Sequence, residues 1–272
     1  WDYDTQWGAD RSRSGKGPRS YGHLEFENTE VLLEVHAEYN VPACFAVVGS
    51  AALPGERPYH DREQVARIHA AGHEVGSHSF RHEWLPKLTR PELLETLRSS
   101  RHALEDCIGA EVTSFVPPFN QPYDYPAGWS FSRSERQEVK GFRTDLGILC
   151  QALAETGYRF CRVAHRSLLQ RTKEWVVGRR IDQPSELQDI HGIQCARLNT
   201  PGGFSSQTRL LLEENLDSGG LWVVYGHPHS ILEDGPQSIH HLRELLRLVA
   251  DWRKAGRIQC VLPRQLTELS RG

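Results

Sequence analysis

The feature that most constrains the fold is an alternation of short apolar runs with amphipathic segments. The apolar runs have the length of buried strands, and the segments between them have helical periodicity. Strands are predicted at Trp1–Asp4, Ala43–Val48, His73–Gly76, Val112–Val116, Tyr158–Ala164, Ile193–Leu198, Leu221–Tyr225 and Ile258–Leu262. Buried strands that alternate with helices predict parallel β-α units. About seven such units favour an α/β fold built as a distorted (β/α)7-type barrel rather than an open sheet.

The amphipathic segments carry helix start and stop signals. Thr89-Arg90-Pro91-Glu92 is a capping box with proline in the first turn, and Gly72 follows the helix before it. Helices are predicted at 29–39, 61–71, 89–107, 144–156, 208–216, 242–255 and 263–269. A basic loop is predicted at 11–20 and a long irregular insertion at 123–141. No linker interrupts the pattern, so residues 1–272 are predicted to form a single domain.

Composition limits the possible function classes. Charged residues make up 25% of the chain and hydrophobic residues 38%, which is typical of a globular protein, and the net charge of −3 argues against a nucleic-acid partner. No apolar run approaches the roughly 20 residues that span a bilayer. The six cysteines form no CxxC pair, which favours reduced thiols and a cytoplasmic location. No leader is visible, but the chain opens at Trp1 and contains no Met, so its true start can lie upstream.

Reactive side chains of a barrel lie at the C-terminal ends of its strands, and this rule selects among the polar residues. Four predicted strands end in groups capable of chemistry. These groups are Asp2 and Asp4, His78 and His82, the segment Pro117–Asn120, and His227 with His229.

Two of these groups together suggest a metal centre. His78 and His82 are four apart, so on a helix both imidazoles would share a face, although such pairs are also common on solvated helices. Asp2 and Asp4 are two apart and share a face of a strand. Two neighbouring carboxylates resist being charged together unless a cation is near. One carboxylate and two imidazoles suit Zn²⁺ or a similar ion, and the second carboxylate suits a general base.

At this point the sequence resembles a known family. The segment His78-Ser79-Phe80-Arg81-His82, preceded by Gly72-His73-Glu74-Val75-Gly76-Ser77, is similar to the second motif of the polysaccharide deacetylases, the NodB-homology proteins of carbohydrate esterase family 4. The resemblance implies that His78 and His82 bind the metal. Asp2-Tyr3-Asp4 resembles the first motif, which implies Asp4 as the third ligand and Asp2 as the catalytic base.

The remaining motifs are matched less closely. Val116-Pro117-Pro118-Phe119 resembles the third motif, and this implies that the Phe119 N–H helps to hold the oxyanion beside Pro118. Val116 stands where the family has an arginine that braces the base, so that brace is missing or comes from elsewhere. Asn120 and Trp84 are candidate substrate contacts.

Leu221–His227 resembles the fifth motif, which implies His227 as the catalytic acid; His227 is preferred to His229 because it directly follows the predicted strand. For the acidic residue of the fourth motif, Asp145 is the best candidate on sequence order.

The resemblance implies hydrolysis of an N-acetyl group on an amino sugar or glycan. The expected cofactor is Zn²⁺, with Co²⁺, Ni²⁺ or Fe²⁺ as alternatives, and the expected partner is a carbohydrate substrate. Two other functions stay open. One is an amidohydrolase of the same fold that acts on a small cyclic amide or ureide, as allantoinases and imidases do. The other is a non-catalytic carbohydrate-binding relative. Oligomeric state is left open.

Overall fold

A computed structural model describes residues 1–13, 17–120, 145–163, 172, 176–177, 185–200, 202–233, 235 and 237–269 of the chain, with the exception of the Asn120 and Leu269 side chains. The predicted insertion at 123–141 lies outside the described residues. The prediction that residues 1–272 form a single domain stays a prediction.

The centre of the molecule is one seven-stranded sheet with the order β1-β2-β3-β4-β5-β7-β6. All neighbouring strands are parallel except β6, which pairs antiparallel with β7. The fold class is therefore α/β, as the alternation of apolar and amphipathic segments predicted. The strands are β1 Asp2–Tyr3, β2 Cys44–Val47, β3 Glu74–Ser77, β4 Ser114–Phe115, β5 Phe160–Val163, β6 Gln188–Ile190 and β7 Ile193–Arg197.

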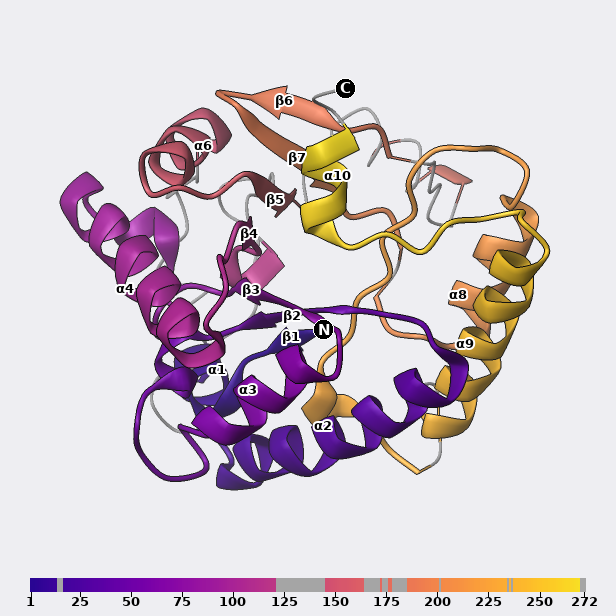
Figure 1. Ribbon diagram of the computed structural model, residues 1–272, viewed down its shortest axis with the longest axis horizontal. Coiled ribbons are helices and arrows are strands. Elements are labelled where there is room, and N and C mark those ends of the chain that lie inside the picture. Colours follow the sequence, from indigo (N-terminus) through magenta and orange to yellow (C-terminus); the bar gives the residue numbers. More distant parts are fainter. Residues whose placement is uncertain are drawn as a thin grey trace.

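Helices form an outer ring around these strands (Figure 1). Most of the predicted helices are confirmed, with shifts of a few residues at their ends. The α-helices are α1 Thr5–Ser12, α2 Arg19–Tyr39, α3 Arg62–Ala70, α4 Arg90–Ile108, α6 Leu146–Glu155, α8 Ser206–Glu214, α9 Ile239–Lys254 and α10 Pro263–Leu269. The described residues also include the short 3-10 turns η1 Gly49–Ala52, η2 Leu85–Lys87, η3 Pro118–Asn120 and η4 Pro228–Ser230.

The sheet is completed to a distorted barrel by an irregular segment, residues 221–226, that lies between the end of β7 and β1. Residues 221–226 were predicted to contain a strand, and this prediction is wrong: only Leu221 forms an isolated bridge, with Ser185. Their backbone is held instead by the Asn199 side chain, which donates to Leu221 O at 2.9 Å and accepts from Val223 N at 3.0 Å. On the other side Asp2 N donates to Gly226 O at 2.9 Å. The segment thus connects the end of β7 to β1.

The end of the barrel opposite the C-terminal strand ends is closed by α10. Glu74 opens β3 and is buried, and its carboxylate accepts hydrogen bonds from Ser114 Oγ and, at 3.0 Å, from the Arg264 backbone N–H. An acidic group at the start of a helix satisfies free N–H groups and complements the helix dipole. The core between sheet and helices includes fully buried Tyr3, Phe26 and Phe45.

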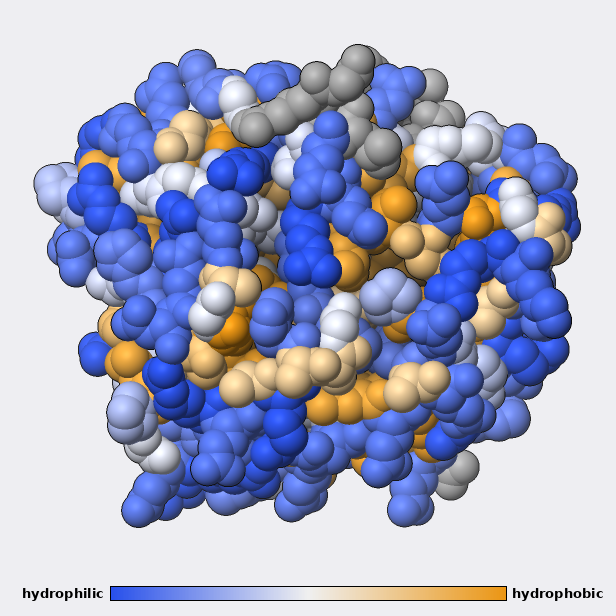
Figure 2. Space-filling model, viewed as in Figure 1, coloured by the Kyte–Doolittle hydropathy of each residue, from blue (hydrophilic) through white to orange (hydrophobic). Residues whose placement is uncertain are grey.

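Other sequence predictions are also corrected. The loop expected at 11–20 contains the end of α1 and the start of α2, and residues 258–262 form no strand. Helix α1 and strand β6 were not predicted. All six cysteines are free thiols. Among the described helices, none has the length and apolar character that a membrane span needs. The face in Figure 2 is mostly hydrophilic, with apolar residues exposed in short bands.

Candidate metal centre

Strand β1 directs its two aspartates to one side and its tyrosine to the other. Tyr3 points outward, where its hydroxyl donates to Gln64 Oε1 at 2.7 Å and its ring packs edge-on against Phe26. Asp2 and Asp4 point to the opposite side, as the two-residue period of a strand requires. Both carboxylates are nearly buried. The predicted shared face of Asp2 and Asp4 is therefore confirmed.

The two histidines lie on a tight turn after β3 and not on a helix, which corrects the interpretation of their four-residue spacing. Ser79 and His82 have left-handed backbone conformations, with φ of 63° and 55°, and these fold His82 back toward His78. The turn is fastened from outside, because Ser79 O accepts from Gly49 N and from Ser100 Oγ, both at 2.9 Å. Rigid support of this kind maintains a strained backbone at a functional site.

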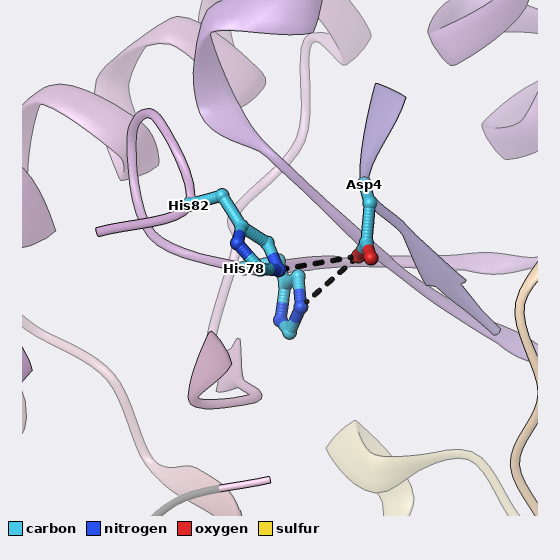
Figure 3. A group of neighbouring side chains, drawn as sticks. All are labelled: Asp4, His78 and His82. Atoms are coloured by element: carbon cyan, nitrogen blue, oxygen red, sulfur yellow. Dashed lines mark ion pairs between the residues drawn. The ribbon is translucent and has the colours of Figure 1, made fainter. Parts of the chain in front are cut away.

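The side chains of Asp4, His78 and His82 converge on one point (Figure 3). One donor atom from each residue lies within 4.8 Å of the other two, and all three side chains are buried. His78 Nε2 lies 3.2 Å and His82 Nε2 3.6 Å from Asp4 Oδ1. Asp4 Oδ1 is nevertheless buried without a hydrogen-bond partner.

The hydrogen bond that His78 makes on the far side of its ring is compatible with a cation beside Asp4. Its Nδ1 lies 2.7 Å from Val116 O, a carbonyl that can only accept, so the proton of a neutral ring belongs on Nδ1. Nε2 then presents a lone pair to the Asp4 carboxylate. Burial opposes charging of His78, but its contact with Asp4 outweighs burial and raises its pKa, while burial lowers the pKa of His82 to about 3. Three buried electron-pair donors facing one another fit a divalent metal ion.

Asp2 is held by an arginine that the sequence analysis did not identify. Arg162 of β5 donates to both carboxylate oxygens, with Nη1–Oδ1 at 2.8 Å and Nη2–Oδ2 at 2.6 Å. The guanidinium also lies over the Tyr225 ring at 4.9 Å. Burial alone would raise the pKa of Asp2, but Arg162 outweighs it and holds this pKa well below the usual range. The brace that Val116 cannot supply thus comes from the next strand, and an arginine within an apolar strand was the available signal.

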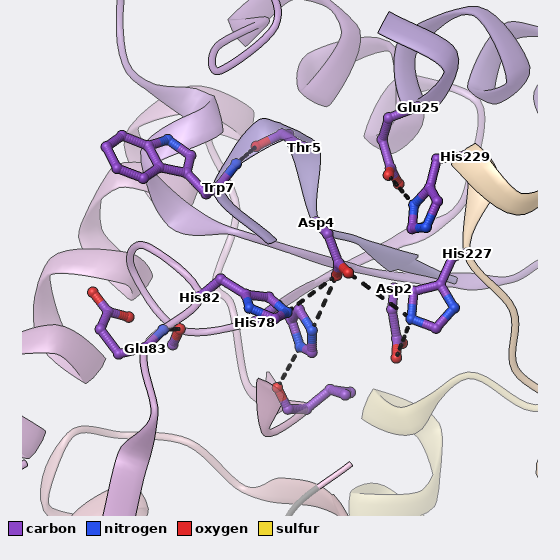
Figure 4. A network of polar contacts seen from close by, with 12 residues as sticks. Asp2, Asp4, Thr5, Trp7, Glu25, His78, His82, Glu83, His227 and His229 are labelled. Atoms are coloured by element: carbon purple, nitrogen blue, oxygen red, sulfur yellow. Dashed lines mark hydrogen bonds and ion pairs between the residues drawn. The ribbon is translucent and has the colours of Figure 1, made fainter. Parts of the chain in front are cut away.

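His227 completes the group from the opposite side. Its Nε2 lies 3.9 Å from Asp2 Oδ2 and 3.9 Å from Asp4 Oδ2, and its side chain is 34% exposed. Burial lowers the pKa of His227, although the two carboxylates oppose that effect. The imidazole therefore sits between the carboxylates and solvent, and Figure 4 shows it facing both aspartates.

The segment after β4 forms the wall next to His82. Phe119 has a left-handed backbone, with φ of 60°, and its ring meets His82 edge-on at 4.4 Å. Trp84 is stacked on Phe119 at 3.9 Å, and the two are only 5% and 7% exposed. Trp84 thus supports Phe119 and does not present an open ring face to solvent. Pro118 is buried, and Asn120 ends η3.

Two further acidic residues contrast in position. Asp145 is exposed and caps α6 by accepting from Ile148 N at 3.1 Å, a local role that its place in the sequence did not reveal. Glu25 of α2, which the sequence did not single out, is completely buried and lies 2.8 Å from His229 Nδ1. Burial raises the pKa of the Glu25 carboxyl. In His229, burial opposes the charged form, but the hydrogen bond to Glu25 outweighs it and raises the pKa.

The fold and the site together define an α/β barrel with a candidate divalent-metal centre at the ends of its strands. Residues 17–127 match the family model described as polysaccharide deacetylase. This part of the chain is thus similar to the polysaccharide deacetylases, the family whose motifs the sequence resembles. The family match includes His78, His82 and Phe119, but it ends before His227 and begins after Asp2 and Asp4.

Two curated relatives are similar to part of the chain. The chain is 32% identical over 114 residues to the chitooligosaccharide deacetylase of Sinorhizobium fredii, which covers 39% of this chain and 50% of the relative. It is 28% identical over 120 residues to the peptidoglycan deacetylase of Helicobacter pylori, which covers 43% of this chain and 36% of the relative. The chain thus spans half or less of the length of these curated relatives.

A solved structure supports the fold along the whole chain. A Mycobacterium smegmatis protein assigned provisionally to the polysaccharide deacetylases superposes with a TM-score of 0.67 at 18% identity. The superposition covers 100% of this chain and 88% of the other. This similarity concerns the fold, which is the distorted barrel predicted from the sequence.

Proposed function

We propose that the chain is a metal-dependent hydrolase that removes an N-acyl group, in particular N-acetyl, from an amino sugar or glycan. The observation that carries the proposal is the convergence of Asp4, His78 and His82 beside a second carboxylate, Asp2, which Arg162 keeps ionised. The match of residues 17–127 to the polysaccharide deacetylase model and the names of the two curated relatives support sugar deacetylation.

Asp4, His78 and His82 would hold the cation, with Zn²⁺ as the first choice because two imidazoles and a carboxylate suit it, and Co²⁺, Ni²⁺ and Fe²⁺ as alternatives. When bound, the cation supplies Lewis-acid polarisation of the amide carbonyl and acidification of a water molecule.

The chain's own residues supply the proton transfers. Asp2 is ionised at neutral pH because Arg162 lowers its pKa, so its carboxylate can accept the proton of the attacking water. His227, across from Asp2 and partly exposed, donates a proton to the departing amine. The Phe119 N–H contributes to holding the oxyanion, and the left-handed backbone at this residue sets the direction of that N–H. Each positioned acid or base of this kind contributes about 10²–10⁴-fold to the rate.

The test measures deacetylation of N-acetylglucosamine oligomers by the purified chain before chelation, after chelation and after zinc is restored. Activity that disappears on chelation and returns with zinc supports the proposal, and Asp2→Asn should lower kcat by about 10²–10⁴-fold. Asp251→Asn, a change in an exposed ion pair of α9, serves as the matched control. Activity that is indifferent to the chelator would contradict the metal mechanism.

A parallel panel of cyclic amides and ureides separates the proposed function from the amidohydrolase alternative. Turnover of these compounds without turnover of N-acetyl sugars would favour that alternative. Sugar binding that Asp2→Asn leaves intact, with no turnover by the wild type, would indicate a non-catalytic relative.

A further inference from the structure

Glu25 is the buried ionisable group that the proposed mechanism does not use. Its residue is 0% exposed, although it carries a carboxylate. One oxygen, Oε2, lies 2.8 Å from His229 Nδ1, and the other, Oε1, is buried without a hydrogen-bond partner. Burying a carboxylate is costly unless it is paired, so the contact with His229 offsets part of the cost of keeping Glu25 in the core.

His229 belongs to the short turn η4, which directly follows His227. Figure 4 shows the Glu25 and His229 side chains pointing toward each other beside His227. The two imidazole rings of His227 and His229 lie 5.3 Å apart, centre to centre. The pair therefore joins α2 to the segment that carries the proposed catalytic acid.

Three side chains on one face of α2 contact η4 and the residue that follows it. Tyr21, Glu25 and Asn28 follow one another at intervals of four and three residues, so they share a helix face. Tyr21 stacks on the His229 ring at 5.2 Å with an interplanar angle of 17°. Asn28 Nδ2 donates to Pro228 O at 2.8 Å and to Ile231 O at 3.2 Å. Three consecutive positions of one helix stripe thus hold residues 228–231.

The His227 imidazole depends on this support. Its Nε2 is 3.9 Å from the nearest oxygens of Asp2 and Asp4, which is beyond hydrogen-bond distance. Within η4, Ser230 N and Ser230 Oγ both bond to His227 O, at 3.0 and 2.8 Å, so the His227 backbone follows the turn. The position of the ring therefore depends on where η4 holds the His227 backbone, and the His229 ring packs beside it.

We propose that Glu25 and His229 are positioning residues that fix η4 on α2 and so keep His227 Nε2 in place between the two aspartates. This inference rests on the proposed function for the role of His227. Glu25 accepts the Nδ1 proton of His229, which orients the ring that Tyr21 covers. Because Glu25 and His229 act through His227, their loss should lower turnover. It should leave metal affinity unchanged, since neither residue belongs to the group of Asp4, His78 and His82.

The experiment compares His229→Ala with His229→Asn, because the Asn side-chain amide can donate to Glu25 from a position close to Nδ1. We expect His229→Ala to lower kcat by about 10–100-fold, since a shift of about 1 Å at a reacting group can cost about 100-fold. KM and the zinc Kd, measured by calorimetry, should stay within about two-fold, and His229→Asn should recover most of kcat. His240→Ala, at an exposed position of α9, is the control.

A wild-type kcat in His229→Ala would overturn the inference, as would a fall in zinc affinity that matches the fall in kcat. NMR of the histidine ring C–H signals supplies a readout that needs no turnover. The His227 signal should be single in the wild type and His229→Asn, and broadened or split in His229→Ala. If the wild type deacetylates nothing but this pattern appears, the proposed function fails while the positioning role stands. If the wild type is active and the His227 signal is unchanged in His229→Ala, the positioning role fails alone.

Discussion

Replacing Arg162 by Met would leave the Asp2 carboxylate buried without its partner. The guanidinium donates two hydrogen bonds to Asp2, at 2.8 and 2.6 Å, and both residues are more than nine-tenths buried. Removal of one partner from a buried ion pair costs about 3–5 kcal/mol. We therefore expect Arg162→Met to lower the free energy of unfolding by about that amount at pH 7, as measured by urea denaturation.

The pH dependence of this loss follows from the pKa of Asp2. In the wild type this pKa is held below its unfolded value, so the pair stabilises the fold above pH ~4, and that stabilisation is lost as the pH falls through the folded pKa. In Arg162→Met burial would dominate and raise the folded pKa above the unfolded value. The difference in stability between the two proteins should therefore be largest near neutral pH and shrink at acid pH.

The pH dependence of catalysis should show the same rise in the pKa of Asp2. A buried carboxyl can gain up to about 3–5 pKa units, so the base of Arg162→Met would be mostly protonated at pH 7. We expect kcat/KM to fall by about ten-fold or more at pH 7 and to recover as the pH rises, with Arg162→Lys intermediate because it keeps a charge but loses the fork. The double variant Asp2→Asn with Arg162→Met should be less destabilised than the sum of its parts. Additive stability losses together with an unshifted pH–rate profile would refute the assignment of Arg162 as the brace.

Two further predictions test the packing around the site. Gly8→Ala should weaken zinc binding measured by calorimetry, because the new Cβ would lie 2.5 Å from Asp4 Cβ and displace that side chain. Alanine by itself favours a helix interior by about 1 kcal/mol, so unchanged zinc affinity with a higher Tm would contradict this prediction. Leu97→Ala, at a fully buried position of α4, should lower the free energy of unfolding in urea by about 2–5 kcal/mol. Leu210→Ala, at a position 48% exposed, is the control and should change it by no more than about 0.5 kcal/mol. Equal losses in the two variants would show that the core is misplaced.

The sequence determined the parts of the fold that local pattern controls. Apolar runs of strand length and capped amphipathic segments placed β2, β3, β5 and β7 and most helices within a few residues, because periodicity and caps reflect which face of an element is buried. The parallel order of successive strands then brought Asp4, His78 and His82 to the same end of the barrel. The match of these residues to family motifs gave them a chemical interpretation.

Local pattern failed where hydrogen bonding is supplied by distant partners. Leu221–Tyr225 has the composition of a strand, but Asn199 and Thr200 side chains bind its backbone in place of a ladder. The histidine spacing suggested a helix, whereas left-handed residues at Ser79 and His82 fold a turn. Side chains of distant elements stabilise these conformations, and no periodicity records them.

Tertiary structure alone decided how the candidate site is supported. Arg162 reaches Asp2 across 160 positions of sequence, and Glu25 reaches His229 across 204. An ionisable residue among buried apolar neighbours, such as Arg162 or Glu25, indicates that it has a partner, because burying an unpaired charge is costly. Which partner it meets depends on where the strand ends and helix faces lie in the folded barrel, and only the assembled three-dimensional structure determines that.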